Sequence, residues 1–94
     1  MRITLLLPQM LRASADGAPR VEIEVSEGAT LGGVLDELHA RHPALERRLR
    51  DERRALRRYV NFYLDGRECR ELDGAASRLA DGAEVLVIPS VAGG

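Results

Sequence analysis

The N-terminal part of the chain contains two stretches in which apolar and polar residues alternate. In residues 2–7 apolar side chains fall at every second position, and in residues 20–25 they alternate with charged ones. A period of two places neighbouring side chains on opposite faces of a strand, so each stretch predicts a strand with one buried face. The polar residues between them include an Asp16-Gly17 turn signal, and we expect a hairpin with a long loop.

The next segment has the pattern of an amphipathic helix. Apolar residues recur from Leu31 at the i, i+3, i+4 and i+7 positions, and Thr30 can cap the N-terminus of the helix. Pro43 limits its length, because the residue before a proline disfavours the helical region. Leu45 and Leu49 are four residues apart and predict a further short helical segment.

Strand patterns return in the C-terminal part of the chain. Residues 59–64 alternate and predict a strand that is followed by an Asp65-Gly66 tight turn. A single helical turn is expected at residues 77–80. Residues 84–88 form an almost continuous apolar run, which is typical of a strand buried on both faces. We therefore expect this last strand in the centre of the sheet, parallel to the first.

The order of these elements predicts an α+β fold. Two strands, a helix and then returning strands give a β-grasp (ubiquitin-like) layout, a mixed sheet with one main helix packed on one face. We expect residues 1–89 to form this domain and residues 90–94 to be a flexible C-terminal tail.

Composition narrows the class of protein. The 94 residues suit one domain, and the net charge of −1 argues against general electrostatic binding to nucleic acid or to a membrane surface. No stretch reaches the roughly 20 apolar residues of a membrane span. With one cysteine, Cys69, no internal disulfide is expected, which favours a cytoplasmic location and an inert, buried thiol.

All 14 basic residues are arginine, and seven of them lie in residues 47–58. Glu46 and Arg50 are spaced for an i, i+4 ion pair, as are Arg48 and Glu52. We interpret the stretch as a solvated helical face, with a patch that steers a partner as the alternative. A nucleic-acid site is not expected, since no aromatic residues are interleaved with the arginines. No metal site is expected either, because the two histidines have no evident third ligand.

The sequence ends in Gly93-Gly94, directly after the last predicted strand. Two glycines carry no Cβ atom, so a tail of this kind can thread into a narrow channel of a partner enzyme and present its carboxylate there. A frayed terminus is the plainer interpretation.

The C-terminal segment resembles a known signature. Its residues are Asp81-Gly82-Ala83-Glu84-Val85 and then Ile88-Pro89-Ser90-Val91-Ala92-Gly93-Gly94. They are similar to the end of the MoaD/ThiS family of ubiquitin-like sulfur carrier proteins, in which a D-G-D-E-V turn, an apolar strand and P-x-V-x-G-G follow one another. Ala83 and Ser90 depart mildly from that pattern. The middle of the chain most resembles the longer members, above all the carrier of actinobacterial cysteine biosynthesis.

The resemblance implies a carrier rather than an enzyme. An E1-like enzyme would use ATP to adenylate the Gly94 carboxylate, and a sulfur donor enzyme would convert it to a thiocarboxylate. An acceptor enzyme, of the PLP-dependent cysteine-synthase kind, would receive the sulfur. No cofactor is expected on the chain itself, which should be a monomer when free.

The resemblance also implies where partners act. Val91, Ala92 and Gly93 would carry Gly94 into the enzyme. Tyr59, Tyr63 and Leu86 on the sheet face opposite the helix would dock partners, with packing at the edge of the core as the alternative. Three alternatives stay open. They are the small subunit of molybdopterin synthase, a ubiquitin-like modifier joined to lysines, and a β-grasp binding module with an inert tail.

Overall fold

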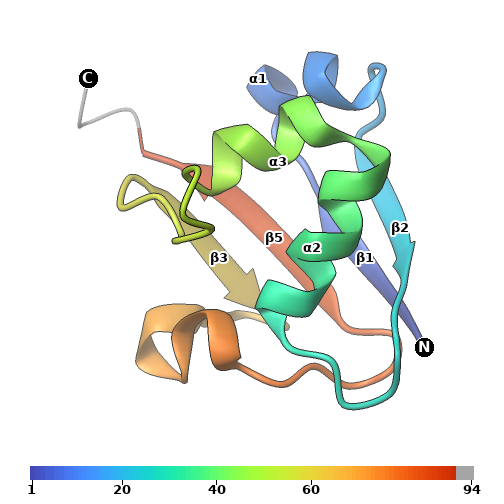
Figure 1. Ribbon diagram of the computed structural model, residues 1–94, viewed down its shortest axis with the longest axis vertical. Coiled ribbons are helices and arrows are strands. Elements are labelled where there is room, and N and C mark those ends of the chain that lie inside the picture. Colours follow the sequence, from blue (N-terminus) through green and yellow to red (C-terminus); the bar gives the residue numbers. More distant parts are fainter. Residues whose placement is uncertain (91–94) are drawn as a thin grey trace.

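The computed structural model describes residues 1–90, and its strands form one five-stranded sheet in the order β2-β1-β5-β3-β4 (Figure 1). The strands are β1 (Arg2–Leu6), β2 (Arg20–Glu24), β3 (Val60–Leu64), β4 (Arg67–Glu68) and β5 (Glu84–Pro89). β1 is antiparallel to β2 and parallel to β5, and β3 is antiparallel to both β5 and β4. The prediction that the last strand is central and parallel to the first is confirmed.

Helices α2 (Leu31–Arg41) and α3 (Pro43–Leu49) lie across one face of this sheet (Figure 1). Thr30 caps α2 as predicted, because its hydroxyl oxygen accepts a hydrogen bond from the Gly33 backbone nitrogen at 3.1 Å. The apolar stripe of α2 is fully buried against the sheet, and its residues are Leu31, Val34, Leu35 and Leu38. The α+β class and the β-grasp layout are thus as predicted.

The segment between β1 and β2 was expected to be a long polar loop, and this prediction was wrong. It contains helix α1 (Gln9–Arg12) and the 3₁₀ turn η1 (Ala13–Ala15). Leu7, Leu11 and Ala15 recur every four residues and are all buried, so the segment adds one more apolar edge to the core. The polar residues between them concealed this spacing.

The helical turn expected at residues 77–80 was also placed wrongly. The 3₁₀ turns are η2 (Cys69–Glu71) and η3 (Gly74–Ala76), and the chain after them is extended. Its backbone pairs with the start of α2, since Leu31 N donates to Ser77 O at 2.9 Å. Close approach is possible because Gly32 has no side chain, and a Cβ atom there would lie 3.3 Å from the Ala75 carbonyl oxygen.

β5 is buried on one face only, which corrects the prediction of burial on both. Val85 and Val87 are fully buried beneath the helices, whereas Leu86 is 39% exposed and Ile88 is 41% exposed on the other face. The helices cover one side of the sheet, so a central strand can have an open apolar face. The continuous apolar run therefore marks exposed apolar surface and not a second buried layer.

β5 ends at Pro89, and residues 91–94 lie outside the described residues. The division into a domain of residues 1–89 and a tail of residues 90–94 therefore stays a prediction. Of the helices that the structure describes, none is both long enough and apolar enough to cross a bilayer.

Candidate functional site

The open face of the sheet carries an apolar row across its three central strands. Leu86 on β5 lies beside Leu6 on β1 and opposite Tyr63 on β3. The same row ends in charged residues at the sheet edges, because Arg20 pairs with Leu6 and Glu68 pairs with Tyr63. Two of the predicted docking residues, Tyr63 and Leu86, are thus direct cross-strand neighbours on an uncovered face.

Ile88 extends this surface, and sequence reasoning missed it. It lies two residues after Leu86 on the same face of β5, opposite Asn61 of β3. The period of two could have found it once one face was known to be open. The far end of the same face is polar, since Arg2 forms ion pairs with Glu22 at 3.5 Å and Glu24 at 3.0 Å. Apolar surface therefore lies toward the end of β5 from which the tail continues.

Tyr59 lies apart from the apolar row, at the point where the chain leaves the sheet. The Ser90 backbone nitrogen donates to the Tyr59 carbonyl oxygen at 2.6 Å, so the last described residue is still held to β3. The Tyr59 side chain is 50% exposed. The predicted docking residues thus occupy two neighbouring places. Gly94, Gly93, Ala92 and Val91, the predicted tail site, lie outside the described residues.

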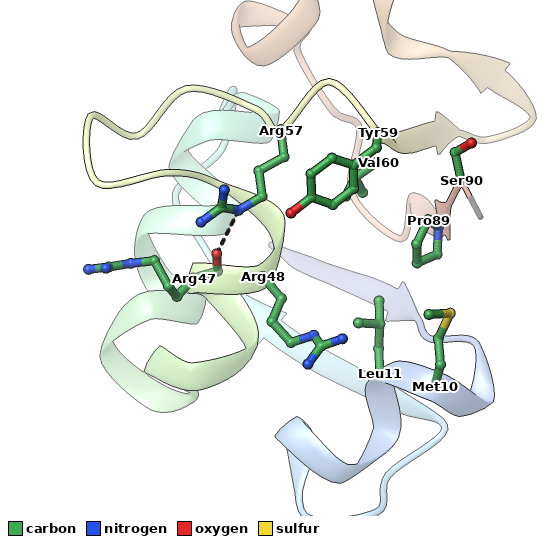
Figure 2. Close-up of a pocket in the computed structure, with 9 residues that line it drawn as sticks. All are labelled: Met10, Leu11, Arg47, Arg48, Arg57, Tyr59, Val60, Pro89 and Ser90. Atoms are coloured by element: carbon green, nitrogen blue, oxygen red, sulfur yellow. Dashed lines mark hydrogen bonds between the residues drawn. The ribbon is translucent and has the colours of Figure 1, made fainter. Parts of the chain in front are cut away.

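A hollow of about 410 Å³ lies beside Tyr59, and we call it the root pocket (Figure 2). Its lining residues are Met10, Leu11, Arg47, Arg48, Arg57, Tyr59, Val60, Pro89 and Ser90. Figure 2 shows Arg48 and the Tyr59 ring reaching into the hollow, whereas the Arg47 side chain points away from it. Its lining combines apolar side chains with guanidinium groups. No pattern in the sequence joined Met10 to the arginines, because they come from α1 and from the segment around α3.

The arginine-rich stretch is largely solvated, as predicted, since five of its seven arginines are exposed, but it is helical only as far as Leu49. α3 ends at Leu49, so Glu52 lies beyond the helix and cannot form a helical i, i+4 pair with Arg48. Glu46 and Arg50 are each only 3% exposed. Their predicted ion pair is confirmed, but it is buried.

The buried pair belongs to a small charge network under α3. Arg50 Nε donates to Glu46 Oε2 at 2.7 Å, and its Nη2 lies 2.9 Å from Asp36 Oδ1. The other oxygen of Glu46 is 2.9 Å from His39 Nδ1. Burial by itself would raise the pKa of Glu46, but the hydrogen bonds with His39 and Arg50 outweigh it and hold this pKa below its usual value.

Cys69 is fully buried, and burial, reinforced by the neighbouring Glu68 carboxylate, raises the pKa of its thiol to about 11. A thiol in that state is a poor nucleophile at neutral pH. This agrees with the predicted inert cysteine and disfavours a persulfide on Cys69.

The fold defines a small ubiquitin-like protein, and the comparisons with known proteins identify it as one of the sulfur carrier proteins, which are carriers rather than enzymes. The ThiS family model matches residues 6–94, and the chain therefore belongs to the ThiS family.

Named relatives agree with this assignment. Sulfur carrier protein CysO of Mycobacterium tuberculosis is 35% identical over 96 residues, which cover 100% of both chains. The molybdopterin synthase sulfur carrier subunit of the same organism is 32% identical over 94 residues, covering 100% of this chain and 99% of the relative. Among solved structures, a chain in the crystal structure of the Amycolatopsis orientalis BexX/CysO complex matches with a TM-score of 0.85 and 32% identity, over 98% of this chain and 99% of that one.

Proposed function

We propose that this protein carries sulfur as a thiocarboxylate on Gly94. The observation that supports this most is the course of β5, the central strand, which leaves the sheet beside an open apolar face and leads into the sequence Ser90-Val91-Ala92-Gly93-Gly94. In a chain of the ThiS family, that course of β5 supports a partner-docking role for the open face next to the start of the C-terminal segment.

The chemistry is supplied by partner enzymes. An E1-like enzyme joins the Gly94 carboxylate oxygen to the α-phosphate of ATP, and pyrophosphate leaves. Hydrosulfide, or sulfide delivered by a donor enzyme, then forms a C–S bond at the acyl carbon, and the bond to AMP breaks. The product is a thiocarboxylate, a far better sulfur nucleophile than a carboxylate.

We favour cysteine, or a related sulfur-containing metabolite, as the product into which this sulfur is incorporated. The CysO relative supports it, since it matches over the whole length of both chains. An acceptor enzyme of the PLP-dependent cysteine-synthase kind would take the sulfur.

The molybdopterin synthase relative supports a second candidate function, the small subunit of molybdopterin synthase. Copurification with a larger catalytic subunit would favour the second candidate. Covalent adducts on lysines of other proteins would instead indicate a ubiquitin-like modifier.

Intact-mass spectrometry tests which group of the protein carries the sulfur. Incubation with the activating enzyme, ATP and sulfide should raise the mass by about 16 Da, because one oxygen is replaced by sulfur. The shift should persist in Cys69→Ser and be absent without ATP. A shift of about 32 Da that vanishes in Cys69→Ser would place the sulfur on the cysteine and contradict the proposal.

A further inference from the structure

Of the seven arginines in residues 47–58, two form ion pairs within residues 1–90 and five do not. Arg50 is paired with Glu46 and Asp36, and Arg54 Nη1 lies 3.6 Å from Asp36 Oδ1. By contrast, within residues 1–90 no carboxylate oxygen lies within 4.0 Å of the guanidinium nitrogens of Arg48, Arg57 or Arg58. Arg50 and Arg54 pair with Asp36 of α2. Of the five unpaired arginines, Arg53 lines neither of the hollows that include Ser90, and the other four line one of them.

Besides Arg47, whose side chain points away (Figure 2), three of the unpaired arginines line hollows that also include Ser90, the last described residue. Arg48 and Arg57 line the root pocket together with Ser90 (Figure 2). Arg58 lines an adjoining hollow of about 490 Å³ with Tyr59, Asn61 and Ser90. Tyr59 borders both hollows. Three guanidinium groups without an ion-pair partner in residues 1–90 thus lie near Ser90, and the Asp51 carboxylate lines a third hollow with Arg57 and Arg58.

Hydrogen bonds to backbone carbonyl groups hold Arg57 in place before any partner arrives. Arg57 N donates to Leu49 O at 3.0 Å, and Arg57 Nε donates to Arg47 O at 2.9 Å. Arg70 Nη2 donates to Arg57 O at 3.0 Å, which fixes the same residue from the other side. The Asp51 carboxylate organises the preceding turn by accepting from the backbone nitrogens of Arg53 and Ala55 at 2.8 and 3.0 Å. Preorganised groups lose less entropy on binding than mobile ones.

We propose that the root pocket and Arg58 dock an acidic, partly apolar surface of the enzyme that adenylates the tail. The proposal rests on the proposed function, since it assumes that an enzyme receives this tail. Carboxylates on the enzyme neutralise Arg48, Arg57 and Arg58, and an apolar side chain enters the hollow against Met10 and Pro89. Complementary charge at this point orients the start of the tail as the tail enters the active site. Its main effects are on the specificity and the association rate of binding.

Direct titration of the full-length chain against its activating enzyme tests the proposal. The double variant Arg48→Gln/Arg58→Gln removes two charges whose side chains make no described hydrogen bond. Its dissociation constant should rise roughly 5- to 30-fold at low ionic strength, and the difference from wild type should shrink as salt is added. The matched control is Arg53→Gln, which removes an exposed charge from the same stretch but lines neither hollow. It should bind as wild type does.

The outcomes separate this proposal from the proposed function. Equal affinity of the double variant, Arg53→Gln and wild type, with pyrophosphate exchange intact, would overturn the docking proposal alone. Wild-type protein that binds the enzyme through these arginines but supports no exchange would overturn the proposed function alone. Absence of both binding and exchange would overturn both. Loss of binding to a single-stranded oligonucleotide, with affinity for the enzyme unchanged, would assign the arginines to nucleic acid and also overturn the docking proposal.

Discussion

Glu46 and Arg50 form an ion pair one helical turn apart, with Nε and Oε2 at 2.7 Å and both side chains buried. Ion pairs at this spacing are common on solvated helix surfaces, where they contribute little. Here the pair lies between α2 and the turn that follows α3, and Arg50 also reaches Asp36 of α2. The pair therefore joins the two helices, and it supports the turn that carries Arg57 and Arg58.

Removing one partner of this pair should destabilise the protein strongly. Arg50→Met leaves the Glu46 carboxylate buried without its guanidinium, which should cost about 3–5 kcal/mol of unfolding free energy. Denaturant unfolding followed by circular dichroism measures it. The control Arg54→Gln removes an exposed partner of the same Asp36, and it should stay within about 0.5 kcal/mol. Equal effects of the two variants would contradict the assignment of the buried pair.

The stability contributed by Glu46 should depend on pH in a defined direction. Because the pKa of Glu46 is lower in the folded protein, the stabilisation is present above its unfolded value of about 4.3 and is lost as pH falls through the folded value. The gap in unfolding free energy between wild type and Glu46→Gln should be constant near neutral pH and should narrow in acid. A gap that widens on acidification would show that the pKa of Glu46 is raised, and not lowered, in the folded protein.

Substitutions on the open face of β5 should weaken partner binding, and substitutions on its buried face should lower stability. The double variant Leu86→Ser/Ile88→Ser changes exposed residues, so we expect stability to change by no more than about 1 kcal/mol while affinity for partner enzymes falls. Val87→Ala on the buried face should cost roughly 1–3 kcal/mol and leave the affinity of the folded protein unchanged. Thermal melts and binding titrations on both variants measure the two effects. Unchanged partner affinity in the double serine variant would remove the docking role of the open face.

Deleting Gly93-Gly94 should separate activity from folding. The buried core lies within residues 3–87, so stability should change by less than about 0.5 kcal/mol. Pyrophosphate exchange should be abolished, because the carboxylate would stop short of the nucleotide by about 3.3 Å for each missing residue. Gly93→Val should also impair exchange, since a β-branched side chain does not fit a channel shaped for bare backbone. Normal exchange by the truncated chain would refute the carrier proposal.

Cys69 should resist alkylation until the protein unfolds. With a thiol pKa of about 11, about one molecule in a thousand carries a thiolate at pH 8, and that thiolate is fully buried. Iodoacetamide should therefore modify the folded protein very slowly and the denatured protein quickly, as mass spectrometry can follow. Rapid labelling under native conditions would indicate an accessible thiol and reopen the persulfide alternative.

Local pattern in the sequence determined most of the architecture. Alternation in residues 2–7, 20–25 and 59–64 and the apolar stripe after Thr30 each fix which side of an element is apolar. The central place of the last strand, parallel to the first, followed from its being the most apolar strand. The Gly93-Gly94 ending and its preceding motif indicated the family before any geometry was known. These are properties that a short stretch of chain expresses on its own.

Only the tertiary structure decided what covers each surface and which charges meet. The sequence could not show that Leu86 and Ile88 face an open side of the sheet, because an apolar strand has the same pattern whether or not a second layer covers it. Nor could it distinguish Arg50 from Arg48, which lie two residues apart in the same stretch. Arg50 meets Asp36 on another helix, while Arg48 points into the root pocket. Such pairings depend on elements that are distant in sequence and are brought together by the packing of α2 and α3.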